Sequence, residues 1–118
     1  MAKFSNYKDS WKHSNLERSD DGVLEIHLHT DNGPLWWGGS PHRELPELFA
    51  AVAADRDNRV VILTGTGAHF IDYHADDAAK LADGVPAGLW DSILWEGKRL
   101  ITNYLDIDVP IICAINGP

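Results

Sequence analysis

Cysteine is almost absent from this sequence, since Cys113 is the only one among 118 residues. A single cysteine cannot form a disulfide within the chain, which is typical of proteins from a reducing compartment. No apolar run approaches the ~20 residues that a membrane-spanning helix needs. The first 15 residues contain no apolar stretch of the kind found in a secretory signal peptide. We therefore expect a cytoplasmic protein without a membrane span.

Basic residues are also scarce. The chain has 10 Lys and Arg against 18 Asp and Glu, which gives a formal net charge of −8. These basic residues are scattered, so no basic patch is predicted that could bind the phosphates of a nucleic acid or an anionic lipid surface. The charge balance therefore argues against nucleic-acid and membrane partners. Coenzyme A would need a local basic patch as well.

The rest of the composition is that of an ordinary globular domain, with 44 % apolar and 24 % charged residues. A chain of this length forms at most one domain. Residues 1–14 are mostly polar, with three aromatic side chains, and we expect them to form an N-terminal arm. Residues 15–118 are then expected to form a partial α/β core.

Strict alternation of apolar and polar residues over 23–29 predicts a half-buried strand. Its apolar side chains are Leu24, Ile26 and Leu28. Residues 15–18 precede this strand across a turn that contains Gly22, so the two segments are expected to form a β-hairpin.

The stretch 35–42 combines two adjacent tryptophans with two glycines and a histidine, and it predicts a shaped loop. A helix is predicted after it, because apolar residues recur with helical spacing over 45–53. Ser40 and Pro41 are expected at its N-cap and first position. Pro46 indicates that the regular part begins later, near the start of the apolar repeat.

Two continuous apolar runs, 60–64 and 111–115, predict buried parallel strands. The loop 65–70 follows the carboxyl end of the first run, where parallel α/β folds bind their ligands. A short polar helix is predicted over 75–82 and a longer one over 87–105. This order predicts an α/β fold, with a β-hairpin followed by right-handed parallel βαβ units.

The longer helix is expected to face the core with one apolar stripe, on which Gly97 would allow a close helix crossing. The stripe consists of Leu89, Ile93, Leu100, Ile101 and Tyr104. The last predicted strand is followed by no element that would cover its faces, so we expect an exposed sheet edge.

Two segments resemble the crotonase (enoyl-CoA hydratase/isomerase) superfamily. Residues 55–67 (DRDNRVVILTGTG) resemble a strand and loop of that fold, and residues 109–117 (VPIICAING) resemble its strand P-x-I-A-A-I-N-G. Within the superfamily, the resemblance is to 6-oxocamphor hydrolase and related β-diketone hydrolases. It rests on the pattern W-x4-H-x-E-L at 37–45 and on WEGKRLITN at 95–103. The resemblance implies the N-terminal half of a crotonase-like fold.

The resemblance also implies a reaction, the cleavage of a C–C bond in a cyclic β-diketone by a retro-Claisen mechanism. Trp37 is implied to lie over the diketone, and His42 to hold a carbonyl or a water. The backbone N–H of Asp72 is implied to supply one oxyanion-hole donor for the enolate. The general base and the second oxyanion donor would come from family positions that follow Pro118. No cofactor and no metal are expected.

A structural interpretation stands beside each of these roles. Trp37 is also typical of core packing, His42 of a solvent-facing first helical turn, and Asp72 of an ordinary loop. An acyl-CoA hydratase or isomerase is the enzymatic alternative. CoA-binding members usually have small residues where this chain has Ile71, Asp72 and Tyr73.

A non-catalytic fragment that depends on a partner is the remaining alternative. The partner would be a complementary C-terminal chain, or further copies of this chain in a trimer or hexamer. Metal binding is disfavoured at His27 and His29, which suit a solvated strand face. It is also disfavoured at a local His/Asp cluster, whose acidic pair suits a helix N-terminus. That cluster consists of His69, Asp72, His74, Asp76 and Asp77.

Overall fold

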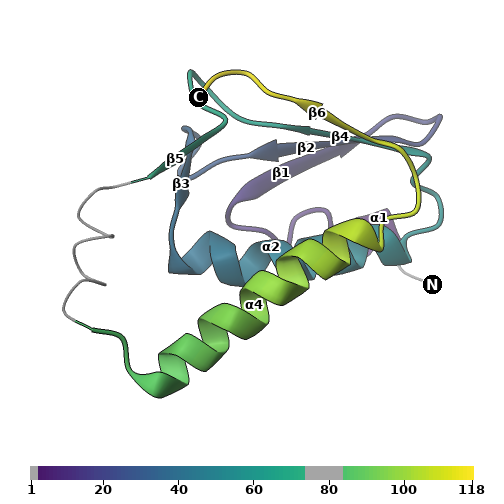
Figure 1. Cartoon of the computed structure of the whole chain (residues 1–118). Coiled ribbons are helices and arrows are strands. Elements are labelled where there is room, and N and C mark those ends of the chain that lie inside the picture. The colour runs from purple at the N-terminus through teal and green to yellow at the C-terminus, as the bar shows by residue number, and fades with distance from the viewer. Residues whose placement is uncertain (1–2, 74–83) are drawn as a thin grey trace.

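The computed structural model describes residues 3–73 and 84–118, and it contains two sheets and three helices within these residues (Figure 1). The main sheet has the order β1-β2-β4-β6, and the second sheet pairs β3 with β5. The strands are β1 (Ser14–Arg18), β2 (Val23–Leu28), β3 (Leu35–Trp37), β4 (Val60–Thr64), β5 (Ile71–Tyr73) and β6 (Ile111–Ala114). The helices are α1 (Phe4–Tyr7), α2 (Gly39–Ala54) and α4 (Ala87–Leu105).

The predicted hairpin and parallel units are confirmed. Strand β1 pairs antiparallel with β2, and β2, β4 and β6 run parallel to one another. The register places Leu24 beside Val61 and Val61 beside Ile111. Because side chains alternate along each strand, these three residues lie on the same face of the sheet. The molecule therefore has the predicted α/β fold.

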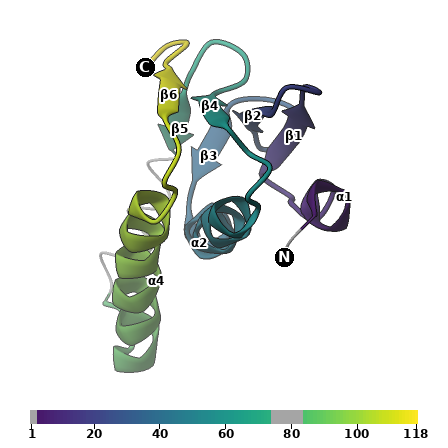
Figure 2. The same cartoon turned by 90° about the vertical axis from the view of Figure 1, so that its right-hand side faces the viewer.

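The core lies between this face of the sheet and α2. Leu24 and Ile26 are completely buried, and α2 contributes Leu48, which is also completely buried, and Val52, which is nearly so. Burying a side chain of this size stabilises the fold by roughly 1.5–3 kcal/mol. Figure 2 shows α2 and α4 side by side beneath the sheet. The end of β3 leads into the beginning of α2 (Figure 1).

Two local predictions around α2 are wrong. Residues 35–37 form strand β3 instead of a loop, because they pair with β5 along its whole length. The helix begins earlier than expected, at Gly39 with Gly38 as its N-cap, and the Gly38 carbonyl accepts the His42 N–H at 3.1 Å. Pro46 lies inside the helix and does not delay its start. Its carbonyl accepts a hydrogen bond from Asn103 Nδ2 at 2.9 Å, which ties α2 to α4.

The predicted core stripe of α4 is only partly confirmed. Leu100 and Tyr104 pack against the core, but Leu89 is 43 % exposed and Ile101 is 62 % exposed. No residue of α4 is fully buried. Helix α4 carries two adjacent apolar stripes, and α2 covers part of the first, which is the predicted core stripe. The second stripe stays exposed and consists of Trp90, Leu94, Ile101 and Leu105.

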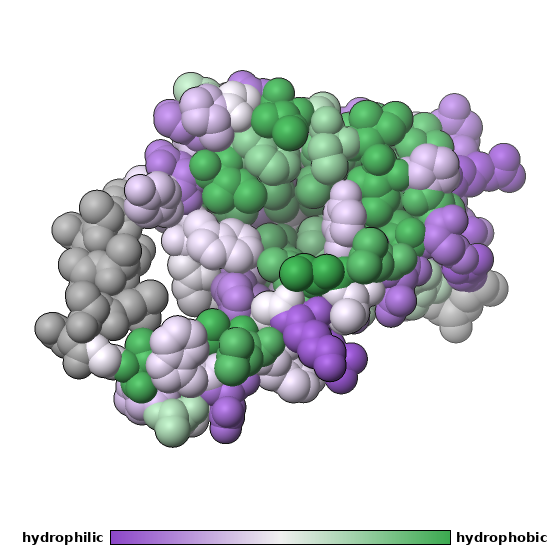
Figure 3. Space-filling model, in the orientation of Figure 1, coloured by the Kyte–Doolittle hydropathy of each residue, from purple (hydrophilic) through white to green (hydrophobic). Residues whose placement is uncertain are grey.

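Strand β6 is exposed on both of its faces. Ile112 is 55 % exposed and Ile115, just beyond the strand, is 68 % exposed. Figure 3 shows apolar side chains over the side of the molecule along which β4 and β6 run in Figure 1. The uncovered sheet edge that the sequence predicted is therefore present in the described part of the chain.

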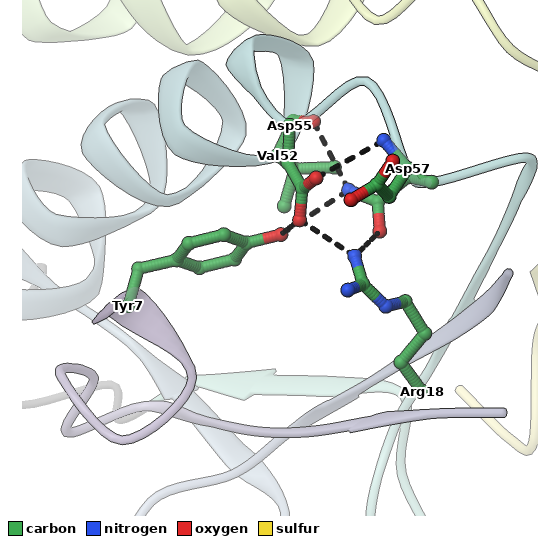
Figure 4. Close-up of polar contacts among 6 residues, drawn as sticks. Tyr7, Arg18, Val52, Asp55 and Asp57 are labelled. Carbon is green, nitrogen blue, oxygen red and sulfur yellow. Dashed lines mark hydrogen bonds and ion pairs between the residues drawn. The ribbon is translucent and has the colours of Figure 1, made fainter. Parts of the chain in front are cut away.

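A buried polar cluster ties the leading segment to the core (Figure 4). Tyr7 Oη donates to Asp55 Oδ2 at 2.6 Å, and Arg18 Nη1 forms an ion pair with the same oxygen at 2.6 Å. Asn58 Nδ2 donates to Tyr7 Oη at 3.2 Å. The Asp55 side chain is completely buried, so these donors satisfy a carboxylate that has lost its water. The cluster joins α1, β1 and the end of α2.

Asp55 and Tyr7 titrate abnormally as a result. Burial alone would raise the pKa of Asp55, but the hydrogen bonds from Tyr7, the Asp57 backbone and Arg18 outweigh it and hold that pKa below its usual value. Burial, reinforced by the Asp55 carboxylate, raises the pKa of Tyr7. The phenol therefore stays protonated and keeps its hydrogen bond at neutral pH.

The predicted short helix over 75–82 lies outside the described residues. Among the helices that are described, none combines the length and apolar character needed to cross a membrane.

Candidate functional site

The three residues proposed for the site lie on three neighbouring elements. Trp37 ends β3, His42 lies in the first turn of α2, and Asp72 is the middle residue of β5. The β3–β5 ladder pairs Trp36 with Asp72 and Trp37 with Tyr73. Asp72 is therefore one ladder position away from Trp37. The short β3–β5 sheet brings together residues that are 35 positions apart in the sequence.

Trp37 and His42 are in direct contact. Their ring centroids lie 5.8 Å apart with an interplanar angle of 79°, which is an edge-to-face arrangement. Such aromatic pairs contribute about 0.5–1.5 kcal/mol beyond the burial of their surface. The turn from β3 into α2 therefore fixes the imidazole against the indole.

His42 is held from its other side by α4. Its Nδ1 lies 2.8 Å from Glu96 Oε2, and Arg43 Nε donates to Glu96 Oε1 at 3.3 Å. The side chains of His42 and Glu96 are only 17 % and 12 % exposed. Burial would raise the pKa of Glu96, but the hydrogen bonds from His42 and Arg43 outweigh it and hold that pKa below its usual value. Glu96 is therefore a carboxylate at neutral pH.

Gly97 leaves space beside the imidazole. A Cβ atom built on Gly97 would lie 3.5 Å from His42 Nε2 and 4.0 Å from its Cε1. Gly97 was predicted at a close crossing of helices, and no side chain at that position covers Nε2. Within the described part of the chain, Nε2 has no hydrogen-bond partner.

Asp72 is half-buried, and its side chain stays local. Its Oδ1 accepts the Tyr73 backbone N–H at 2.8 Å. The predicted oxyanion donor is its backbone N–H, whose position depends on how β5 and the loop before it are anchored. Phe70 N, which precedes β5, donates to the carbonyl of Pro118 at 2.7 Å.

The loop between β4 and β5 is fixed by residues at the end of β6. Asn116 Oδ1 accepts the Gly65 N–H at 3.1 Å, and Asn116 Nδ2 donates to the Gly67 carbonyl at 2.8 Å. A Cβ atom on Gly117 would collide with the Ala68 carbonyl oxygen. The Asn-Gly pair therefore packs its backbone directly against this loop.

Glu96 and Asn116 were missed as site residues by the sequence analysis. Both lie in segments that carry the family resemblance, WEGKRLITN and VPIICAING. Their contacts reach across 54 positions to His42 and 51 positions to Gly65. Only the resemblance could have drawn attention to them, because no local pattern marks a partner so distant in the sequence.

His27 and His29 differ in burial and have different hydrogen-bond partners. His27 Nε2 lies 3.0 Å from Glu25 Oε2 on the open face of the sheet, and Glu17 is close to both. His29 lies beyond β2, is only 8 % exposed, and its Nδ1 accepts the Asn32 N–H at 3.2 Å. Burial, helped by the nearby His13, lowers the pKa of His29.

No metal is assigned to the exposed group of Glu17, Glu25 and His27, since exposed carboxylates often lie close together without one. Three members of the predicted His/Asp cluster, His74, Asp76 and Asp77, lie outside the described residues. Two hollows of the described surface lie elsewhere. One lies between the end of α2 and residues 107–109, and the other lies among the turns that precede β2 and β4.

No protein-family model matches this chain, and no curated protein matches it. Solved structures do match. A β-diketone hydrolase from the cyanobacterium Anabaena sp. PCC 7120, bound to (S)-3-oxocyclohexyl acetic acid, is 38 % identical with a TM-score of 0.84. The match covers 94 % of this chain and 44 % of that protein.

Two further matches show the fold alone. An enoyl-CoA hydratase from Shewanella pealeana is 15 % identical with a TM-score of 0.79, and covers 98 % of this chain and 44 % of that one. An enoyl-CoA hydratase/isomerase from Mycobacterium paratuberculosis is 21 % identical with a TM-score of 0.76, and the match covers 93 % of this chain and 43 % of that one. The chain thus spans less than half the length of each of these proteins.

Proposed function

We propose that this chain is part of a hydrolase that cleaves the C–C bond of a cyclic β-diketone. Its structural neighbours are crotonase-superfamily members, and its described elements form part of the crotonase fold. The observation that carries the proposal is the Trp37–His42 pair, held one ladder position from Asp72. The 38 % identity to a β-diketone hydrolase supports the choice of substrate class.

The proposed reaction is a retro-Claisen cleavage. A water molecule loses a proton to a base and adds to one carbonyl carbon. The bond from that carbon to the central carbon then breaks, which leaves a carboxylic acid on one side and an enolate on the other. The central carbon finally takes up a proton. The charge that must be stabilised lies on the enolate oxygen.

The residues of this chain have separate proposed roles. The Trp37 indole N–H, a donor only, orients one carbonyl of the diketone. The Asp72 backbone N–H donates to the enolate oxygen, and removing one such donor typically costs about 3–4 kcal/mol of transition-state stabilisation. His42 holds a water or a carbonyl. The general base and second oxyanion donor are proposed to come from a complementary segment.

The exposed apolar surface supports the need for such a segment. Helix α4 has a second apolar stripe, including Leu94 at 66 % and Leu105 at 72 % exposed, and β6 is exposed on both faces. A helix that is apolar on two sides is normally buried on both. We propose that β6 and this stripe are covered either by a complementary C-terminal chain or by further copies of this chain in a trimer or hexamer. Cys113, an exposed free thiol, suits a reducing cytoplasm.

The oligomeric part is tested by charge substitution on the second stripe. The double variant Leu94→Lys and Ile101→Lys should dissociate assemblies of the wild-type chain in sedimentation velocity, with little change in secondary structure. The matched control, Asp91→Lys and Lys98→Glu, alters exposed polar positions of the same helix and should leave assembly unchanged. A wild-type chain that sediments as a monomer at all concentrations would contradict self-association.

The catalytic part is tested with the chain co-produced with a complementary polypeptide that carries the remaining, unmatched sequence of the Anabaena hydrolase. Loss of the ultraviolet absorbance of a cyclic 1,3-diketone reports cleavage, and hydration of a crotonyl thioester of CoA reports the alternative. Trp37→Phe should reduce diketone cleavage at least tenfold, whereas Trp95→Phe, at an exposed position of α4 outside the second stripe, should not. Thioester hydration without diketone cleavage would favour the acyl-CoA alternative. A folded, assembled complex that performs neither reaction would favour the non-catalytic interpretation.

A further inference from the structure

The contact between His42 and Glu96 determines which imidazole nitrogen carries the proton. An ionised carboxylate can only accept hydrogen bonds. Glu96 Oε2 lies 2.8 Å from His42 Nδ1, so Nδ1 must be the donor. In the neutral imidazole the other nitrogen, Nε2, then has no hydrogen and is an acceptor.

The surroundings of Nε2 agree with an acceptor that is kept free for an incoming group. Gly97 presents no side chain toward it, although an alanine there would be in ordinary contact at 3.5 Å. A glycine in the interior of a helix is intrinsically unfavourable compared with alanine. The space beside Nε2 is therefore maintained at a cost to the helix.

We infer that Glu96 is a positioning residue that fixes His42 with its proton on Nδ1, so that Nε2 accepts a hydrogen bond from an O–H group of the reacting species. This inference deepens the proposed function and rests on it for the identity of that species. A neutral Nε2 cannot donate to a carbonyl oxygen. The geometry thus favours the water that adds to the diketone over a substrate carbonyl as the partner of His42.

Arg43 contacts Glu96 from the solvent side. It donates to the second oxygen of Glu96 at 3.3 Å and is itself 68 % exposed. Its guanidinium keeps the carboxylate ionised and oriented, while leaving Oε2 to His42. Each oxygen of Glu96 therefore has its own donor.

The tautomer is measured directly by long-range ¹H–¹⁵N correlation spectra of the full chain labelled with ¹⁵N-histidine. Nε2 couples to both carbon-bound ring protons and Nδ1 chiefly to one, so the pattern assigns each nitrogen, and the ¹⁵N chemical shift shows which of them has no proton. We expect that nitrogen to be Nε2 in the wild type. Glu96→Gln, whose amide oxygen still accepts, should keep this state, and Glu96→Ala should shift His42 toward the Nε2–H form. Glu47→Ala, an exposed glutamate on α2, is the control and should change nothing.

The space at Nε2 is tested separately by Gly97→Ala. Diethyl pyrocarbonate acylates unprotonated imidazole nitrogens, and mass spectrometry of peptides reports the rate at His42. Gly97→Ala should slow this reaction at least threefold while the melting temperature stays equal or rises. Gly88→Ala, where an added Cβ meets open space, should leave the rate unchanged.

A proton on Nε2 in the wild type, or a tautomer unaffected by Glu96→Ala, would overturn the role of Glu96. An unchanged acylation rate in Gly97→Ala would overturn the role of the open space. Neither measurement depends on turnover of a diketone. Failure of the proposed function in the activity assay, with the expected tautomer present, would therefore leave the positioning role intact and change only the reacting species.

Discussion

The amide oxygen of Asn116 accepts the backbone N–H of Gly65 at 3.1 Å, and this contact joins the end of β6 to the beginning of the loop that leads to Asp72. The amide nitrogen of the same side chain reaches the Gly67 carbonyl at 2.8 Å. One side chain thus satisfies a donor and an acceptor of the loop between β4 and β5.

Replacement of Asn116 by alanine should loosen this loop. Both loop groups would turn to water, so the free energy of unfolding should fall by only about 1 kcal/mol. Amide hydrogen exchange at residues 65–70 should accelerate at least fivefold in the variant. Asn6→Ala, at an exposed position of α1, should leave exchange there unchanged. Unaltered exchange in Asn116→Ala would mean that the backbone contacts to Pro118 alone fix the loop.

The buried cluster around Asp55 should dominate the stability of the chain. Asp55→Ala leaves Arg18 without its ion-pair partner and Tyr7 Oη without its acceptor, and breaking a buried ion pair in this way costs about 3–5 kcal/mol. Tyr7→Phe removes two hydrogen bonds, one donated to Asp55 and one accepted from Asn58, and keeps the ion pair, at about 1–2 kcal/mol. Urea unfolding followed by circular dichroism measures both. Equal losses in the two variants would show that the ion pair contributes nothing beyond the tyrosine.

Acid should unfold the chain partly through Asp55. Its pKa is lower in the folded state than in the unfolded chain, so it contributes stability above the ordinary value of about 4 and loses that contribution as the pH falls through the folded value. The pKa of Glu96 is also lower in the folded chain, so its contribution to stability is likewise lost as the pH falls. The free energy of unfolding, measured between pH 7 and pH 3, should fall less steeply in Asp55→Asn than in the wild type. Asp20→Asn, at an exposed turn, should follow the wild-type curve.

Gly22 is required by the turn between β1 and β2. Its φ angle is +91°, and a Cβ atom there would lie 2.9 Å from the Asp57 carbonyl oxygen. Gly22→Ala should therefore destabilise the chain by about 1–3 kcal/mol. Gly88→Ala, in the first turn of α4 with open space around it, should be neutral or stabilising by up to about 1 kcal/mol. Thermal unfolding distinguishes the two, and a tolerated Gly22→Ala would show that this turn can rearrange.

The regular elements were predictable because their periodicity is strong. Alternation over 23–29 and the apolar runs at 60–64 and 111–115 each encode a strand locally, and the structure contains β2, β4 and β6 there. Strand β3 was not predictable in this way. It has three residues, and it exists because β5, more than 30 positions later, pairs with it.

The candidate site was likewise predictable only where a pattern in the sequence marked its residues. Trp37, His42 and Asp72 were named from their resemblance to a family pattern, and the structure places Trp37 against His42 with Asp72 nearby. Their catalytic roles stay predictions. The partner of His42 could not be predicted, because a glutamate in an amphipathic helix is ordinary until the crossing of α2 and α4 brings it to an imidazole.

Helix α2 holds the proposed site and the buried ion pair at opposite ends. His42 lies in its first turn and Asp55 just past its last residue, which is about 20 Å along an axis that rises ~1.5 Å per residue. Residues so far apart, with no shared partners, usually contribute independently to the free energy of unfolding. Side chains around the proposed site can therefore be exchanged at one end of the helix without weakening the ion pair that stabilises the fold at the other end.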